Sequence, residues 1–333
     1  MVSSGRTPLR PRRIAIVRAL MLGDLLCAVP ALRAFRRGFP EAEITLVGLA
    51  WADEFAARFR HLVDDFVALP GFPGLPETRP DFEGLATFFA SMQERGLDLA
   101  VQLHGSGRVT NRLAAMLGAP RVAAFVEPGA EVPDPELSVS WPETGHEVHR
   151  LLALPRELGL PETGCELELP LSSADRADAA ALAPELEPGR YAVIHPGARS
   201  ATPWRAERFT AVAARLAERD LRIVLTGSAD EAETTAAVAA ALDGHALDLA
   251  GRTSLGALGT LVAGAAVTVT NDTGISHVAA AVRAPSVVVV TTSDPDRWAP
   301  LDRDRHRVCV RPHSADPVVR EAEKLLRPSA IAA

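Results

Sequence analysis

The sequence contains few lysine, cysteine or aromatic residues. Lys324 is the single lysine, so arginine supplies nearly all of the positive charge. The three cysteines (Cys27, Cys165 and Cys309) lack the spacing of a zinc site or a disulfide framework, which predicts thiols in a reducing compartment. No stretch reaches the roughly eighteen apolar residues of a membrane span, and no apolar signal segment follows the N-terminal arginines. We therefore expect a cytoplasmic protein.

Other absences exclude several classes of function. The net charge of −7 disfavours a nucleic-acid partner. No Gly-x-Gly-x-x-Gly follows the first predicted strand, which argues against a nicotinamide dehydrogenase. Two Asp-x-Asp pairs, at 294–296 and 302–304, are interpreted as solvated loop, so we predict no metal site. The first forty residues hold eight arginines and a single acid, Asp24. This excess indicates either contact with an anionic partner, such as the inner membrane surface, or a basic tail and a solvated helix.

Short apolar, β-branched runs alternate with helical segments along the whole chain. This alternation is typical of parallel, doubly wound sheets, so the predicted fold class is α/β with two Rossmann-like domains facing across a cleft. The proline-rich stretch 127–141 is predicted to be a loop, and the segment after 290 an irregular acidic one. The expected divisions are a disordered tail (1–11), an N-terminal domain (12–170), a linker (171–190), a C-terminal domain (191–315), and a helix and tail (316–333).

The most informative stretch runs from Val267 to Val282. A buried strand is predicted up to Thr270, followed by the turn Asn271–Gly274 and an Ala-rich helix. Backbone N–H groups at a helix start have no partner within the helix and attract anions. Asp272 or Thr273 is expected to cap the helix, and Gly274 would allow a ligand close to the backbone. An ordinary strand-to-helix turn is the alternative.

Further candidates follow other predicted strands, where ligands bind in such sheets. Asp24 is either a general base in a cleft or a helix N-cap. The loop that includes Gly197, Ala198, Arg199 and Thr202 is rich in small and hydroxyl residues and could cradle phosphate oxygens.

Two more positions stand in similar places. Glu231, in the turn that begins at Gly227, could accept the hydroxyls of a ribose or could be a surface glutamate. His104 lies in a Gly-flanked loop and is the best candidate for a histidine lining a cleft.

Five separated motifs resemble those of glycosyltransferase family 9, the ADP-heptose:lipopolysaccharide heptosyltransferase type of GT-B enzyme. The resemblance runs from about residue 14 to residue 310. The motifs are Ile16-Val-Arg-Ala-Leu-Met-Leu-Gly-Asp-Leu-Leu-Cys-Ala-Val-Pro-Ala-Leu32, Asp98-Leu-Ala-Val-Gln-Leu-His-Gly105, His146-Glu-Val-His-Arg150, His195-Pro-Gly-Ala-Arg199 and Asn271-Asp-Thr-Gly-Ile-Ser-His-Val-Ala-Ala280.

The resemblance implies an inverting glycosyltransferase that needs no metal or cofactor and takes an ADP-linked sugar as donor. It implies that Asp24 is the catalytic base, that Asp272, Thr273 and Gly274 contact the donor's diphosphate and sugar, and that Glu231 binds the ribose. The loop after His195 would bind phosphate.

The acceptor implied is a cell-envelope glycan or glycolipid, and we expect it near Arg18 and His104. Thr202 departs from the family pattern, which commonly has Lys or Arg there. Either Arg199 or Arg205 supplies the positive charge that Thr202 lacks, or the donor differs from the one implied by the family. A GT-B protein that binds sugar nucleotide or glycan without transfer is the alternative.

Overall fold

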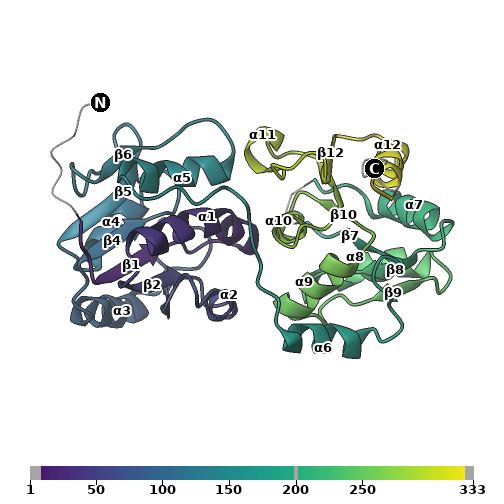
Figure 1. Ribbon diagram of the computed structural model, residues 1–333, viewed down its shortest axis with the longest axis horizontal. Coiled ribbons are helices and arrows are strands. Elements are labelled where there is room, and N and C mark those ends of the chain that lie inside the picture. The colour runs from purple at the N-terminus through teal and green to yellow at the C-terminus, as the bar shows by residue number, and fades with distance from the viewer. Residues whose placement is uncertain (1–8, 199–201, 327–333) are drawn as a thin grey trace, which may run out of the picture. The chain divides into compact units, whose positions relative to one another are not determined.

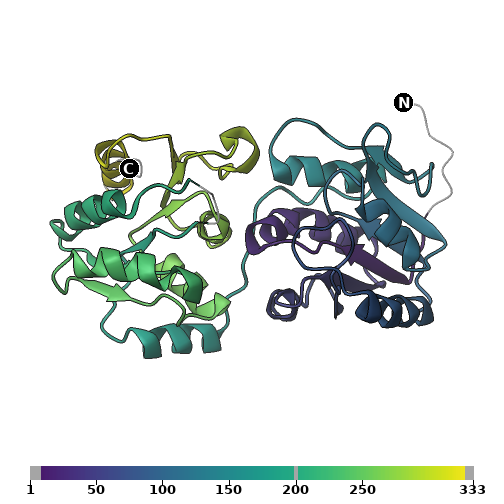
Figure 2. The same cartoon turned by 180° about the vertical axis from the view of Figure 1, so that it is seen from behind.

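The computed structural model describes residues 9–198 and 202–326. The chain divides into two compact units, with the boundary between Glu166 and Leu167 (Figures 1 and 2). No helix within the described ranges is long and apolar enough to cross a membrane.

The first unit is a six-stranded parallel sheet with helices on both faces. The strand order is β3-β2-β1-β4-β5-β6. The strands are β1 (Arg13–Val17), β2 (Glu43–Gly48), β3 (Asp65–Ala68), β4 (Leu99–Gln102), β5 (Arg121–Val126) and β6 (Ser138–Ser140). The helices are α1 (Leu22–Gly38), α2 (Ala52–Arg58), α3 (Phe82–Glu94), α4 (Thr110–Met116) and α5 (Glu147–Glu157).

The hydrophobic effect explains why β1 and β4 lie at the centre of this sheet. Ile14 to Val17 and Leu99 to Gln102 are completely buried, as expected for strands covered on both faces. Phenylalanines 72, 88 and 89 pack with Met92 against one face, and α1 packs against α5 (Figure 1). Pro30 lies inside α1, where its carbonyl accepts a hydrogen bond from Thr163 Oγ1.

The second unit repeats this architecture with the strand order β12-β11-β10-β7-β8-β9. Its strands are β7 (Tyr191–His195), β8 (Arg222–Leu225), β9 (Ala246–Asp248), β10 (Val267–Asn271), β11 (Ser286–Val290) and β12 (His306–Val310). Its helical segments are α6 (Ser173–Leu182), α7 (Ala206–Ala217), the 3₁₀ turn η1 (Ala229–Glu231), α8 (Ala232–Ala240), α9 (Leu255–Gly264), α10 (Gly274–Ala281), α11 (Pro295–Trp298) and α12 (Asp316–Leu326).

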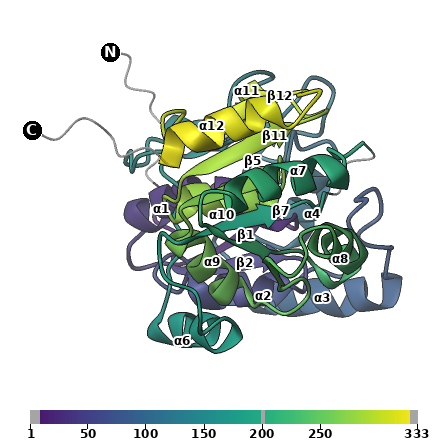
Figure 3. The ribbon, with the colours of Figure 1, turned by 90° about the vertical axis from the view of Figure 1, so that its right-hand side faces the viewer.

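Two segments expected to lie outside the domains belong to the body of the second unit. The 171–190 segment contains α6, which packs against α9. A capping box between Ser172 and Asp175 stabilises the start of this helix. Helix α12 packs along β11 (Figure 3) and buries Val318 and Val319 in the core. Residues 1–8 and 327–333 of the expected tails lie outside the described residues.

Four short elements were not predicted. The 127–141 stretch, predicted to be a loop, contains the edge strand β6, and the segment after 290 contains α11 and β12. Strand β9 was also missed. Prediction failed because edge strands are paired on one side only. Those of three residues, β6 and β9, contain no buried residue and are too short for an apolar alternation to be recognised.

In both sheets the strand order reverses between the two central strands. In the first unit this switch point lies between β1 and β4, and in the second between β7 and β10. Loops that leave two neighbouring strands in opposite directions open a crevice at the carboxyl ends, where ligands bind in such folds. The segments that follow β1, β4, β7 and β10 contain most of the residues that the sequence selected.

Candidate functional site

In the first unit, Asp24 and Arg18 lie together beyond the end of β1. Asp24 stands in the first turn of α1, and its side chain is 25 % exposed. The N-cap of α1 is Met21, so Asp24 does not cap the helix. Arg18 is 1 % exposed. Its Nε donates to the backbone carbonyl of Asp24 at 2.8 Å, Nη1 donates to the carbonyl of Leu103, and Nη2 lies 3.9 Å from Asp24 Oδ1.

Two further ion pairs, both buried, adjoin the first. Arg18 Nη2 lies 3.7 Å from Oε1 of Glu147 on α5, and Glu147 Oε2 lies 3.3 Å from Arg150 Nη1. Arg150 Nε donates to the carbonyl of Pro142, and its guanidinium lies 4.3 Å from the ring centre of Trp141. Since buried charges are tolerated when paired, this network explains how three buried charged groups, Arg18, Glu147 and Arg150, lie beside the partly exposed Asp24.

His104 joins the same cluster as a neutral ring. Its Nδ1 accepts a hydrogen bond from the backbone N–H of Ala19, which assigns the proton to Nε2. Burial, aided by the charge of Arg18, lowers the pKa of His104 to about 3. The 4.0 Å approach of Nε2 to Glu77 is therefore not an ion pair at neutral pH. Gln102 Nε2 and Thr110 Oγ1 both donate to the His104 carbonyl and fix the loop.

The structure thus brings together Arg18, Asp24 and His104, which the sequence selected as the candidate base and the acceptor side, and adds Glu147. Glu147 was missed, although it lies in the motif His146–Arg150, to which no role had been assigned. Its position three residues before Arg150 carried no chemical signal by itself.

Two of the basic residues on α1 serve internal contacts. Arg33 donates to the backbone carbonyls of Thr163 and Glu166. Arg36 donates to three backbone carbonyls and pairs with Asp64. These two arginines therefore tie the helix to neighbouring loops, which weakens the interpretation of α1 as a basic surface for an anionic partner.

In the second unit, the turn after β10 leads directly into α10, as predicted. Thr273 occupies the N-cap position, but its side chain makes no capping hydrogen bond. The side chain of Asp272 accepts a hydrogen bond from Ser293 Oγ. Thr273 therefore stands at the predicted N-cap position, but neither its side chain nor that of Asp272 closes the first turn. Such a helix start favours an anionic oxygen.

Asn271 connects this turn to the loop after β7. Its Nδ2 lies 2.8 Å from the carbonyl of Pro196 and 3.3 Å from that of Gly197, and its Oδ1 accepts from the N–H of Trp204 at 3.2 Å. One buried amide therefore holds both ends of the predicted phosphate loop. Of the predicted residues in this loop, Gly197 is buried, Ala198 half-buried and Thr202 exposed, whereas Arg199 lies outside the described residues.

Glu231 lies over the start of the same loop. Its Oε2 accepts from Ser228 N at 2.8 Å and stands 3.7 Å from His195 Nε2. A Cβ placed on Gly197 would lie 2.2 Å from the Glu231 carboxyl carbon. Burial lowers the pKa of His195, while the charge of Glu231 opposes this effect. The structure therefore places Gly197 and Gly227 against the side chain of Glu231, which is 22 % exposed.

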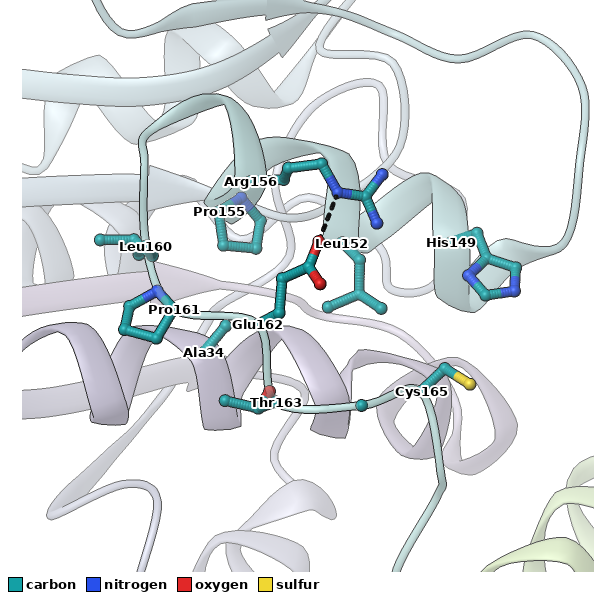
Figure 4. A pocket seen from close by; sticks show the side chains of 11 residues that line it. Ala34, His149, Leu152, Pro155, Arg156, Leu160, Pro161, Glu162, Thr163 and Cys165 are labelled. Carbon is teal, nitrogen blue, oxygen red and sulfur yellow. Dashed lines mark ion pairs between the residues drawn. The ribbon is translucent and has the colours of Figure 1, made fainter.

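A separate pocket of about 190 Å³ in the first unit holds none of the predicted site residues (Figure 4). It is lined by α1, α5 and the segment after α5, and an Arg156–Glu162 ion pair of 3.5 Å borders it. Within the described ranges, no group of three or more His, Cys, Asp or Glu side chains could hold a metal ion.

The comparison with known families decides the class of protein. Residues 86–327 match the model of glycosyltransferase family 9 (heptosyltransferase). The chain belongs to glycosyltransferase family 9. This family 9 chain is 25 % identical to lipopolysaccharide heptosyltransferase 2 of Escherichia coli K12, over 87 % of its own length and 85 % of that protein.

Solved structures show that this glycosyltransferase has the GT-B fold. A family 9 structure from Veillonella parvula superposes with a TM-score of 0.82 at 20 % identity, covering 96 % of this chain and 98 % of that one. An E. coli heptosyltransferase solved with ADP superposes with a TM-score of 0.70 at 21 % identity, covering 94 % and 99 %. The predicted fold class and enzyme class are both confirmed.

Proposed function

We propose that this glycosyltransferase transfers a heptose-like sugar from an ADP-linked donor to a hydroxyl of a lipopolysaccharide-type acceptor on the cytoplasmic side of the membrane, with inversion and without a metal. The names of its relatives support the sugar and the pathway, since one is a lipopolysaccharide heptosyltransferase and another was solved with ADP. The observation that carries the proposal is the buried pairing of Arg18 with a partly exposed Asp24 at the switch point of the first sheet.

The second unit supplies the donor side of the proposed reaction. The uncapped start of α10 would hold the diphosphate, and Glu231 would accept the ribose hydroxyls. Backbone N–H groups there stabilise the negative charge that grows on the diphosphate as its bond to the sugar breaks. These fixed dipoles would fulfil the role that a divalent cation plays in metal-dependent transferases.

Asp24 acts as the general base in this mechanism. Its carboxylate takes the proton of the acceptor hydroxyl while that oxygen bonds to the anomeric carbon. The electron pair of the breaking bond leaves with the ADP, and attack from the opposite face inverts the configuration. His104 is neutral, so Nε2–H serves as a hydrogen-bond donor to the acceptor rather than as a cation.

The Asp24→Asn variant tests the base assignment. We expect sugar transfer to fall by roughly 10²- to 10⁴-fold, the usual contribution of a general base. Binding of ADP, followed by calorimetry, should persist because Asp24 lies in the first unit. Asp53→Asn, which changes an exposed acid in the first turn of α2, is the matched control. Wild-type transfer by Asp24→Asn would contradict the proposal, and retention of configuration in the product would contradict inversion.

A further inference from the structure

We propose that Glu147 is a positioning residue that keeps the Arg18 guanidinium shared between two carboxylates, so that Arg18 does not close onto Asp24. This inference rests on the proposed role of Asp24 as the base. Arg18 Nη2 is 3.7 Å from Glu147 and 3.9 Å from Asp24, both beyond the roughly 2.7–2.9 Å of a charge-assisted hydrogen bond.

The contacts of Arg18 explain why this arrangement is stable. Nε and Nη1 are fixed by two backbone carbonyls, those of Asp24 and Leu103. The buried Nη2 makes no hydrogen bond within the described part of the chain. It is attracted instead by two carboxylates, those of Asp24 on α1 and Glu147 on α5, at similar distances that are longer than a hydrogen bond. Asp24 is thus paired by charge while its oxygens are left without a hydrogen bond from Nη2, and they can receive the proton of an acceptor hydroxyl.

The side chain of Glu147 is itself held in place by further contacts. Its side chain is 3 % exposed, and Arg150 lies 3.3 Å from its second oxygen. Arg150 is fixed in turn by the Pro142 carbonyl and the ring of Trp141. Helix α5 therefore presents a carboxylate at a defined distance from Arg18, which a mobile surface acid would not do.

The charges around Asp24 give the expected effect of removing Glu147. The neighbouring elements contribute Arg18 from the loop after β1, neutral His104 from the loop after β4, and Glu147 and Arg150 from α5. Glu77 and His146 lie farther out, against His104 and at the N-cap of α5 respectively. Without the Glu147 charge, Arg18 acts on Asp24 alone, and protonating the base then requires a lower pH.

The experiment compares pH profiles of kcat/KM for the full-length enzyme carrying Glu147→Gln, Glu147→Asp or Glu157→Gln. For Glu147→Gln, we expect the acidic limb to move to lower pH by on the order of one unit, for charges a few ångströms apart in a protein interior. We also expect a several-fold lower kcat with little change in the KM for donor. Glu147→Asp keeps the charge and should keep the limb. Glu157, exposed on the same helix, controls for general changes to α5.

A second variant keeps the test decisive if Glu147→Gln fails to fold. Arg150→Gln removes the competing cation from Glu147, and its acidic limb should move to higher pH. If the limb of whichever variant folds coincides with that of the wild type, the inference is overturned, even if thermal stability has fallen. The Asp24→Asn variant distinguishes failure of this inference from failure of the proposed base. If Asp24→Asn is inactive while the acidic limb of Glu147→Gln is unmoved, only the role of Glu147 is rejected.

Discussion

Gly197 provides a sensitive test of the proposed donor site, because the carboxylate of Glu231 fills the space that a side chain at position 197 would need. In Gly197→Ala, the new Cβ would stand 2.2 Å from the Glu231 carboxyl carbon, so the Glu231 side chain must move. The backbone at Gly197 does not have a positive φ, so alanine introduces no backbone strain there. We therefore expect a local change at Glu231 with the fold retained.

The contacts that Glu231 loses set the size of the effect. Rotating its carboxylate away breaks the 2.8 Å hydrogen bond from Ser228 and the approach to His195. Hydrogen bonds to charged groups contribute about 1.5–3 kcal/mol. If Glu231 binds the ribose, displacing it should weaken nucleotide binding by roughly ten- to a hundredfold.

Calorimetric titration of the full chain with ADP measures this loss. The Glu231→Ala variant provides the background that isolates the mechanism. If Gly197→Ala acts by moving Glu231, it should have little further effect when Glu231 is already absent, since the two changes remove one interaction. Equal weakening in both backgrounds would refute the reasoning, as would unchanged ADP affinity in Gly197→Ala alone.

Three further outcomes follow from buried polar groups and thiols. Asn271→Ala removes three hydrogen bonds that hold the loop after β7, so we expect a loss of about 2–3 kcal/mol in unfolding free energy, and an unchanged denaturation midpoint would contradict this. Burial lowers the pKa values of His104 and His306 to about 3 and about 4 in the folded protein, so below pH 6.5 these histidines are protonated in the unfolded chain before they are in the folded one. Protonation of each histidine in the unfolded chain should lower the free energy of unfolding by about 2 kcal/mol at pH 5. An unchanged melting temperature between pH 7 and pH 5 would contradict this expectation. A thiol reagent should label half-buried Cys165 in the native protein and the two buried cysteines only after denaturation; three fast thiols would contradict the described packing.

The sequence was a good guide where local pattern determines structure. Apolar runs such as Ile14–Val17 and Ser286–Val290 predicted buried interior strands because burial on both faces requires nearly continuous apolar residues. The turn Asn271–Gly274 was recognised as a strand-to-helix junction. The short edge strands left no such pattern.

Long-range contacts were beyond sequence reasoning. Arg18 and Glu147 are 129 positions apart, and only the packing of α1 on α5 brings them together. Asn271 was assigned to a turn, yet its amide reaches a loop about 75 residues earlier in the chain. In both cases the residue type suggested polarity, but the partner followed only from the tertiary fold.

The matching strand orders of the two sheets have a consequence for how this enzyme is made. Among residues 9–198 and 202–326, every strand of the first sheet comes from before Trp141, and neither sheet takes a strand from the other unit. Since domains generally fold from the N-terminus during synthesis, the first unit can complete its sheet and its buried ion pairs while the second is still being translated. Ribosomes that stall late in the second half should therefore carry a folded N-terminal unit, with the Arg18–Glu147 network already formed.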